Sequence, residues 1–106
     1  MLKILNEIPR IIGEYDSGKE GPLLFITAGI HGNEPSGIKA LEKVFTELEK
    51  TKPEINGRIV GVKGNKSALQ KGQRYIDEDL NRTWTEDNVN NNDPETQEQR
   101  EMHEII

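Results

Sequence analysis

A nearly continuous apolar run, Leu23–Ile30, constrains the fold of this chain more than any other feature. It reads Leu-Leu-Phe-Ile-Thr-Ala-Gly-Ile, follows Gly21-Pro22, and has the length and composition of a β-strand. A strand without alternating polar residues is expected to be covered on both faces, as strands are in parallel or mixed sheets. The run therefore predicts a buried strand of an α/β domain.

The residues after this run complete a strand–helix–strand pattern. Pro35 suits the first position of a helix over 35–50, because its missing N–H would be unpaired there anyway. One face of this helix is apolar at Ile38, Leu41, Phe45 and Leu48. A second strand is predicted over 58–63. Such a βαβ unit places its two strands parallel to one another in one sheet.

Weaker patterns flank this unit. The Asn-rich segment 88–93 is expected to be an exposed loop, because Asn and Asp side chains compete for backbone hydrogen bonds. Asp93 and Pro94 suit the N-cap and first position of a last helix over 94–106. The remaining predictions are a strand over Ile8–Tyr15, a turn at 16–18, one helical turn over 65–70 and a loop over 71–81.

Charge is concentrated near one end of the chain. The 14 Lys and Arg residues oppose 19 Asp and Glu residues, for a net charge of −5, yet residues 85–106 alone hold seven acids and one base. The acidic balance argues against nucleic acid as a partner. The absence of cysteine excludes a disulfide framework, thiol catalysis and Cys-ligated zinc. Because no membrane span or secretory signal is recognisable, we expect a cytoplasmic protein without a membrane partner.

The last predicted helix ends on an apolar pair, Ile105-Ile106, with no C-cap glycine and no following strand. One interpretation is an ordinary frayed terminus. The interpretation that we favour is that residues 1–106 are the N-terminal part of one longer catalytic domain, in which 85–106 form an acidic loop and helix. The chain would then lack the remainder of its domain.

A candidate metal site lies directly after the apolar run. His31 and Glu34 follow the pattern H-x-x-E between the predicted strand and the Pro35 helix. In open α/β sheets ligands bind beyond the carboxyl ends of the strands. Imidazole and carboxylate are suitable zinc ligands, although a catalytic zinc usually has three protein ligands and a water. The alternative is that both are ordinary loop residues, with Glu34 favouring the helix dipole.

A phosphate-binding loop competes with the metal site for the same residues. Gly32 and Gly37 have the G-x-x-x-x-G spacing of such a loop. The required Gly-Lys-Ser/Thr order is absent, however, because Gly37 is followed by Ile38-Lys39. Glu34 would also repel a phosphate. The pattern therefore argues against a phosphate site.

A second group of functional side chains lies in the segment Gln73–Trp84. Arg74 and Arg82 have planar guanidinium groups suited to carboxylates and oxyanions, and Asn81 could bind the same anion as Arg82. We interpret the neighbouring acids 77–79 as groups that hold the arginines in place. The alternative is a solvated loop with weak local ion pairs. Trp84 is predicted to pack against the protein.

Together the two groups suggest zinc-assisted hydrolysis of an acidic substrate. Zinc activates water and polarises a carbonyl group, and a nearby arginine stabilises the developing oxyanion. A second arginine with Asn81 would hold a carboxylate.

The segments Gly29–Gly37 and Arg74–Arg82, in this order and spacing, resemble the succinylglutamate desuccinylase/aspartoacylase family. The resemblance extends from about Leu23 through Arg82. It implies a zinc carboxypeptidase-like fold, here an incomplete three-layer α/β/α sandwich with a mixed sheet. It also implies one zinc ion and hydrolysis of the amide bond of an N-acyl amino acid. The implied roles are zinc binding by His31 and Glu34, polarisation of the scissile carbonyl by Arg74, and binding of the substrate carboxylate by Asn81 and Arg82.

The chain departs from the family in having no match for its third zinc ligand or its general base. His103 is the other histidine, but it lies in the last predicted helix, and we assign neither it nor Glu101 or Glu104 to these roles. We therefore expect a zinc-dependent deacylase of the N-acyl-aspartate or N-succinyl-glutamate type that is inactive as this chain alone.

Two alternatives stay open. A non-catalytic module could hold a carboxylate with Arg74, Asn81 and Arg82 without metal. A structural domain could instead need a partner chain to complete its sheet, and a homo-oligomer is compatible with either function.

Overall fold

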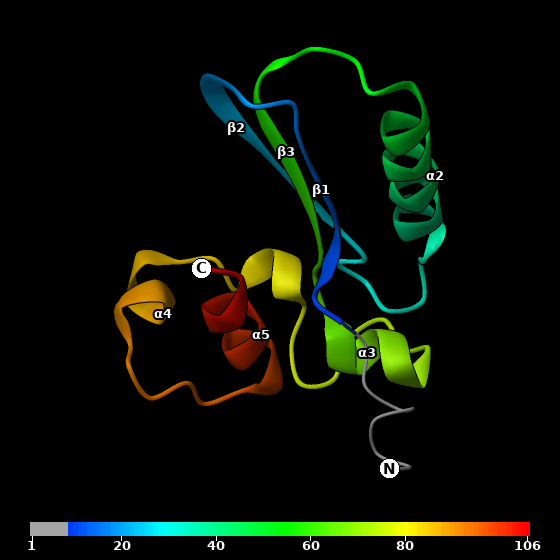
Figure 1. The fold of residues 1–106 in the computed structure, drawn as a ribbon. Coiled ribbons are helices and arrows are strands. Elements are labelled where there is room, and N and C mark those ends of the chain that lie inside the picture. The colour runs from blue at the N-terminus through cyan, green and yellow to red at the C-terminus, as the bar shows by residue number, and fades with distance from the viewer. Residues whose placement is uncertain (1–8) are drawn as a thin grey trace, which may run out of the picture.

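The computed structural model describes residues 9–106 as a small mixed sheet with helices at one face and one end (Figure 1). Ile8, included in the first predicted strand, lies outside the described residues, as does the N-terminal segment assessed for a secretory signal. The elements in chain order are β1 (Ile11–Asp16), β2 (Lys19–Ala28), α2 (Ser36–Thr51), β3 (Asn56–Lys63), α3 (Lys66–Lys71), the 3-10 helix η1 (Leu80–Arg82), α4 (Glu86–Asn90) and α5 (Gln97–Ile105).

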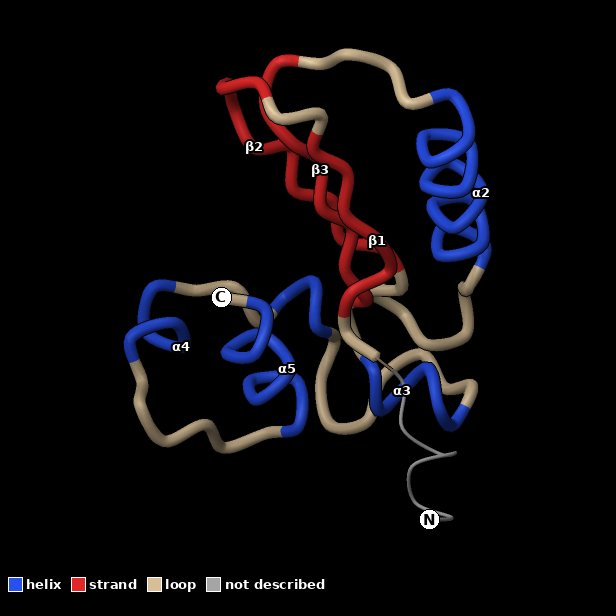
Figure 2. The backbone as a smooth tube through the Cα atoms, viewed as in Figure 1, coloured by secondary structure: helices blue, strands red, loops and turns tan. Residues whose placement is uncertain are grey.

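The sheet has the order β1-β3-β2, so β3 is its central strand. β3 runs parallel to β2, with Phe25 opposite Val60, and antiparallel to β1, with Glu14 opposite Val60. Between β2 and β3 the chain passes through α2, which lies along one side of the sheet (Figure 2). The predicted α/β class, mixed sheet and strand–helix–strand unit are therefore confirmed.

The prediction that the apolar run is covered on both faces is wrong. β2 is an edge strand, and the side chains of Leu23, Leu24 and Phe25 are 49%, 55% and 44% exposed. The buried strand is β3, where Val60 and Val62 are 8% and 4% exposed. Apolar content identifies a strand, but which strand occupies the centre depends on pairing between segments distant in sequence.

Helix α2 packs on the sheet because two glycines leave room for its largest apolar side chain. A Cβ atom added at Gly13 of β1 would lie 2.5 Å from Phe45 Cγ, and one at Gly61 of β3 would lie 2.9 Å from Phe45 Cε2. Phe45 is 7% exposed, and Ile38 on the same face is 8% exposed. The apolar face predicted for this helix therefore provides much of the core.

Truncation of Phe45 should reveal how small this core is. We expect Phe45→Ala to lower the free energy of unfolding by about 3–5 kcal/mol, because the ring fills the space above both glycines. Urea unfolding followed by circular dichroism would measure the loss. Val44→Ala is the control, since Val44 is 47% exposed on the same helix and should change stability little. Equal effects of the two substitutions would contradict this assignment of the core.

The C-terminal helix begins later than predicted. Its N-cap is Thr96, whose hydroxyl accepts a hydrogen bond from the Gln99 amide at 3.1 Å, and not Asp93. The predicted loop over 88–93 is partly helical, because Thr85 caps α4 by accepting from the Asn88 amide. Trp84, predicted to pack, is 41% exposed. Its neighbours Leu80 and Thr83 occupy the buried positions instead.

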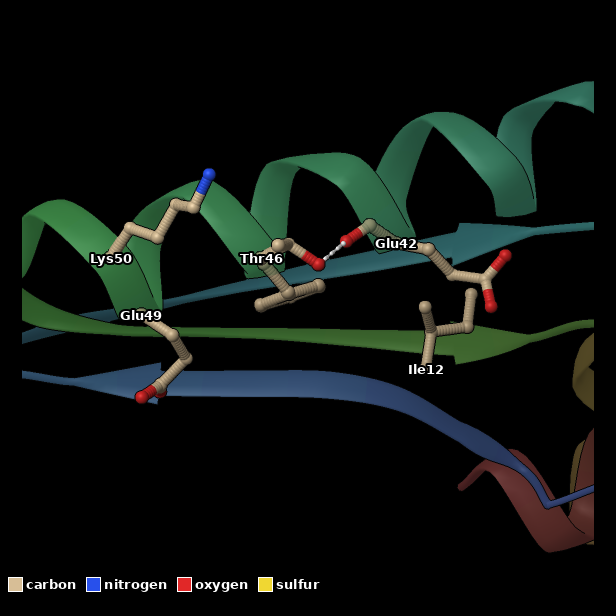
Figure 3. Close-up of a pocket in the computed structure, with 6 residues that line it drawn as sticks. Ile12, Glu42, Thr46, Glu49 and Lys50 are labelled. Carbon is tan, nitrogen blue, oxygen red and sulfur yellow. Dashed lines mark hydrogen bonds between the residues drawn. The ribbon is translucent and has the colours of Figure 1, made fainter.

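A shallow groove runs between α2 and β1, and it is lined by those two elements alone (Figure 3). Thr46 in its wall donates a hydrogen bond to the Glu42 carbonyl oxygen, so this hydroxyl is used within the helix. Among the helices of residues 9–106, none combines the length and apolar character needed to cross a bilayer.

Candidate functional site

The carboxyl ends of β2 and β3 lie side by side and are linked by backbone hydrogen bonds. The Gly64 amide donates to the Ala28 carbonyl oxygen at 2.7 Å, and the Asn65 amide donates to the Gly29 carbonyl oxygen at 2.9 Å. The loop that follows β2 carries His31 and Glu34 before α2 begins. The local pattern thus places both side chains at the strand ends, where ligands bind in open α/β sheets.

His31 lies between two carboxylates. Its Nδ1 is 2.8 Å from Glu34 Oε2, and its Nε2 is 3.0 Å from Asp79 Oδ1. The imidazole is largely buried, whereas the Glu34 side chain is 60% exposed. The H-x-x-E spacing therefore brings the two predicted metal ligands into direct contact.

Asp79 is the site residue that the sequence analysis did not single out. Its Oδ1 atom faces His31 and also accepts from the Asn81 amide at 2.9 Å, while Oδ2 lies 3.9 Å from Arg74 Nη2. Burial by itself would raise the pKa of Asp79, but the hydrogen bonds from Asn81 and His31 and the Arg74 charge hold that pKa below its usual value. Asp79 thus joins the two predicted groups as a carboxylate.

The His31 loop and the segment that carries Arg74 also contact one another through their backbones, at Gly32. Its amide donates to the Arg74 carbonyl oxygen at 3.2 Å. A Cβ atom at Gly32 would lie 2.2 Å from the Ala68 carbonyl carbon and 2.3 Å from the Gln73 carbonyl oxygen. Glycine is therefore needed here for close approach of three backbone segments.

Arg74, Asn81 and Arg82 all have exposed side chains near this junction. Asp79 caps η1, which contains Asn81 and Arg82, and fully buried Leu80 anchors the same turn. Within residues 9–106 Arg82 forms no ion pair, so its guanidinium is available to a ligand. These three residues lie on the same segment as Asp79, which contacts His31.

The interpretation that all three acids 77–79 hold the arginines is wrong for two of them. Only Asp79 approaches Arg74. Asp77 instead accepts from the Gln97 amide at 2.8 Å, and Glu78 accepts from the Thr96 hydroxyl. Both carboxylates therefore bind the start of α5. Asp77 accepts from one of the unpaired N–H groups of the helix N-terminus, whereas Glu78 binds the side chain of the N-cap residue.

The part of the chain that the structure describes contains no group of three His, Cys, Asp or Glu side chains arranged to hold a metal ion. His103 lies on α5, where its Nε2 is 3.0 Å from the Asn88 carbonyl oxygen. His31 and Glu34 thus have the chemistry of zinc ligands without a third partner in these residues.

Two buried acids behind the site make stability depend on pH. Burial alone would raise the pKa of Glu98 and of Glu101, but their hydrogen bonds, and the charge of Arg10 near Glu101, hold both pKa values below 4.5. Because the folded-state pKa values are depressed, this stabilisation is complete above pH 4.5 and is lost as the pH falls below it. We expect urea midpoints to agree at pH 7 and 6 and to decrease steeply below pH 4.5. A Glu98→Gln variant should lose part of this decrease, and an equal decrease in both proteins would contradict the assignment to Glu98.

Residues 20–106 match the family model described as the succinylglutamate desuccinylase/aspartoacylase catalytic domain. The chain is 34% identical over 73 residues to the succinylglutamate desuccinylase of Pseudomonas paraeruginosa, and the match covers 69% of this chain and 21% of that protein. It is 40% identical over 59 residues to the succinylglutamate desuccinylase of Yersinia pestis, with 56% and 18% coverage. The chain thus spans about a fifth of the length of these relatives.

A solved structure has the same fold. The crystal structure of the succinylglutamate desuccinylase from Chromobacterium violaceum superposes with a TM-score of 0.70 at 25% identity, covering 87% of this chain and 28% of that one. The enzyme from Vibrio parahaemolyticus, at 18% identity and a TM-score of 0.62, supports the fold alone.

Proposed function

The chain belongs to the succinylglutamate desuccinylase/aspartoacylase family, and on this premise we propose that it carries part of the active site of a zinc-dependent deacylase. The reaction is hydrolysis of the amide bond of an N-acyl amino acid of the N-acyl-aspartate or N-succinyl-glutamate type. The observation that carries the proposal is the meeting of the two motifs at His31, which contacts Glu34 from one loop and Asp79 from the other.

The donor set fits zinc as two ligands of a site. His31 and Glu34 supply a nitrogen and an oxygen donor that lie next to one another, and these two side chains would hold the ion. Asp79 on the opposite ring nitrogen orients the imidazole, as carboxylates commonly do behind a zinc-binding histidine. When bound, zinc supplies Lewis-acid polarisation and activation of water.

The exposed cationic and amide groups act on the substrate in this proposal. Arg74 stabilises negative charge that develops on the carbonyl oxygen. Arg82 and Asn81, side by side on η1, bind the substrate carboxylate, and the planar guanidinium matches its two oxygens. Asp79 keeps this turn beside His31, so metal and anion sites have a common support.

We further propose that this chain alone binds zinc weakly and does not turn over substrate. A catalytic zinc usually has three protein ligands, and residues 9–106 bring only His31 and Glu34 together in that role. As expected from the sequence, we propose that the protein is cytoplasmic and that its substrate is small and acidic.

Zinc titration by calorimetry tests the proposal directly. We expect weak binding by the chain and at least about tenfold weaker binding by His31→Ala and by Glu34→Gln. His103→Ala is the matched control and should bind like the parent. Zinc affinity unchanged by loss of His31 would overturn the metal assignment. Hydrolysis of N-acetyl-aspartate or N-succinyl-glutamate by this chain, abolished in His31→Ala, would overturn the predicted inactivity.

A metal-free carboxylate-binding module is the second candidate. It is favoured by the exposed Arg82, which forms no ion pair within residues 9–106. Titration with succinate in the presence of a chelator separates the two functions. Tight binding without metal that is lost in Arg82→Ala supports the module. Succinate binding that strengthens when zinc is added supports the deacylase.

A further inference from the structure

Glu98 is a fully buried carboxylate on α5 that directly contacts the segment between Arg74 and Asn81. Its Oε1 atom accepts hydrogen bonds from the amides of Asp77 and Glu78 at 2.9 and 3.0 Å. Its Oε2 atom accepts from the Ile76 amide at 2.8 Å and from Asn65 Nδ2 at 2.7 Å. One side chain thus binds three consecutive backbone N–H groups.

The charge of Glu98 is balanced by these donors. Within residues 9–106 it forms no ion pair with a basic side chain. Burying a carboxylate is unfavourable unless several hydrogen bonds replace its hydration. Both oxygens are therefore occupied by donors, which leaves Glu98 without a free lone pair facing the site and excludes it as a general base.

The contact is reciprocal. Asp77 accepts from the Gln97 amide at 2.8 Å, and Glu78 accepts from the Thr96 hydroxyl, so the same segment binds the first turn of α5. Asp79, which follows directly, reaches His31. Segment 76–78 is consequently bound to α5 through both its backbone amides and its side chains, immediately before the residue that joins the two loops.

Glu98 also connects to the His31 loop along a second route. Asn65, its side-chain partner, is fully buried and donates its backbone amide to the Gly29 carbonyl oxygen, two residues before His31. The Asn65 side chain caps α3 as well, through the Ala68 amide. Glu98 thus contacts both the support of the His31 loop and the backbone that leads to Asp79.

We propose that Glu98 is a positioning residue that sets the place of Asp79, and with it Arg74, Asn81 and Arg82, relative to His31. It acts through the backbone of residues 76–78 and touches neither metal nor substrate. This role rests on the proposed function, since it matters only if His31 and the arginines bind their ligands together.

The Glu98→Gln substitution tests the role with almost no change in size. An amide NH2 group replaces one oxygen and faces two N–H donors, so at least two hydrogen bonds are lost. We expect amide-hydrogen exchange at Ile76, Asp77 and Glu78 to accelerate, and succinate and zinc to bind about tenfold more weakly. Glu95→Gln is the matched control, because Glu95 is exposed and undergoes the same charge change.

Exchange and ligand binding separate failure of this inference from failure of the proposed function. If the parent chain binds neither succinate nor zinc, the proposed function fails, while faster exchange confined to 74–82 still supports Glu98 as the anchor of the segment. Parent-like exchange in a folded Glu98→Gln overturns the inference. So does faster exchange with unchanged affinity for both ligands, since Glu98 would then be structural only.

A second variant covers the case in which Glu98→Gln does not fold. Glu98→Asp keeps the buried charge but withdraws the carboxylate by one methylene from segment 76–78. We expect faster exchange of those amides and an intermediate loss of succinate affinity. A folded Glu98→Asp with parent-like exchange and affinity would overturn the inference.

Discussion

Gly32→Ala is expected to abolish the candidate site by driving its two loops apart. The new Cβ atom would lie 2.2 Å from the Ala68 carbonyl carbon and 2.3 Å from the Gln73 carbonyl oxygen. Both neighbours are backbone atoms and cannot rotate away as a side-chain end could. The His31 loop must therefore move, which breaks the hydrogen bond from the Gly32 amide to the Arg74 carbonyl oxygen.

The expected loss of stability is about 3 kcal/mol, the upper end of the cost of overpacking, because the clash involves two backbone segments. We also expect zinc and succinate to bind at least about tenfold more weakly, since His31 would leave Asp79. Urea unfolding and calorimetric titration measure the two effects on the same samples.

Gly37→Ala provides the matched control. Gly37 lies in the first turn of α2, and a Cβ atom there would be at an ordinary 3.4 Å from Ala28 Cβ. Alanine is favoured over glycine in a helix by about 0.5–1 kcal/mol, so this variant should be as stable as the parent or slightly more so. Parent-like zinc affinity in Gly32→Ala would contradict the close approach of the loops as a requirement of the site.

Local patterns in the sequence were sufficient for much of the fold. The helix over 35–50 appears as α2, and the strand over 58–63 lies within β3, because their periodicity and punctuation are contained within each segment. The order of the strands was not predictable in this way. The tight turn after β1 suggests that β1 and β2 pair, yet β3 lies between them.

The N-terminus of α5 shows how competing local signals mislead. Asp93-Pro94 has the chemistry of a helix start, but Thr96 and Gln99 form the T-x-x-Q pattern of a capping box three residues later. The Gln99 side chain accepts from the Glu95 amide at 2.9 Å, while Thr96 accepts from the Gln99 amide. The reciprocal pattern, given more weight than the single Asp-Pro signal, would have placed the start correctly.

The candidate site was likewise predictable where its contacts are local in sequence and not where they are long-range. His31 and Glu34 are three residues apart, so their contact follows from local spacing. Asp79 lies 48 residues from His31 in sequence, and nothing in its acidic neighbourhood distinguished it from Asp77 or Glu78. Contacts of this length depend on how the sheet brings β2 and η1 together, which a single sequence does not encode locally.

The acids of 85–106 do not all lie at the surface, which the charge count alone does not reveal. Glu98 and Glu101 are 0% and 2% exposed. Glu101 accepts from Arg10 Nη2 at 2.7 Å, from the Lys66 amide at 3.0 Å and from the Ser67 hydroxyl at 2.9 Å. It therefore joins α5 to the residue before β1 and to the start of α3.

Glu101→Ala is accordingly expected to be severely destabilising. It would leave the Arg10 guanidinium, 14% exposed, with exposed Glu104 as its remaining acid partner, and it would remove acceptors from the α3 N-terminus. Breaking a buried ion pair by removing one partner costs about 3–5 kcal/mol. Since domains of this kind are stable by about 5–15 kcal/mol, urea unfolding should show the loss of a large part of the total.

Two further variants, Glu104→Ala and the double variant Arg10→Ala/Glu101→Ala, show the cause of this destabilisation. They distinguish loss of the Arg10–Glu101 ion pair from a general effect of substitution in α5. Glu104 binds the same guanidinium at 2.9 Å but is 57% exposed, so its removal should cost less than about 1 kcal/mol. The double variant should be less destabilised than the sum of its single changes, because neither buried charge is then left alone. If Glu101→Ala and Glu104→Ala unfold at the same urea concentration, Glu101 is a surface acid after all, and α5 is not fastened to the sheet through it.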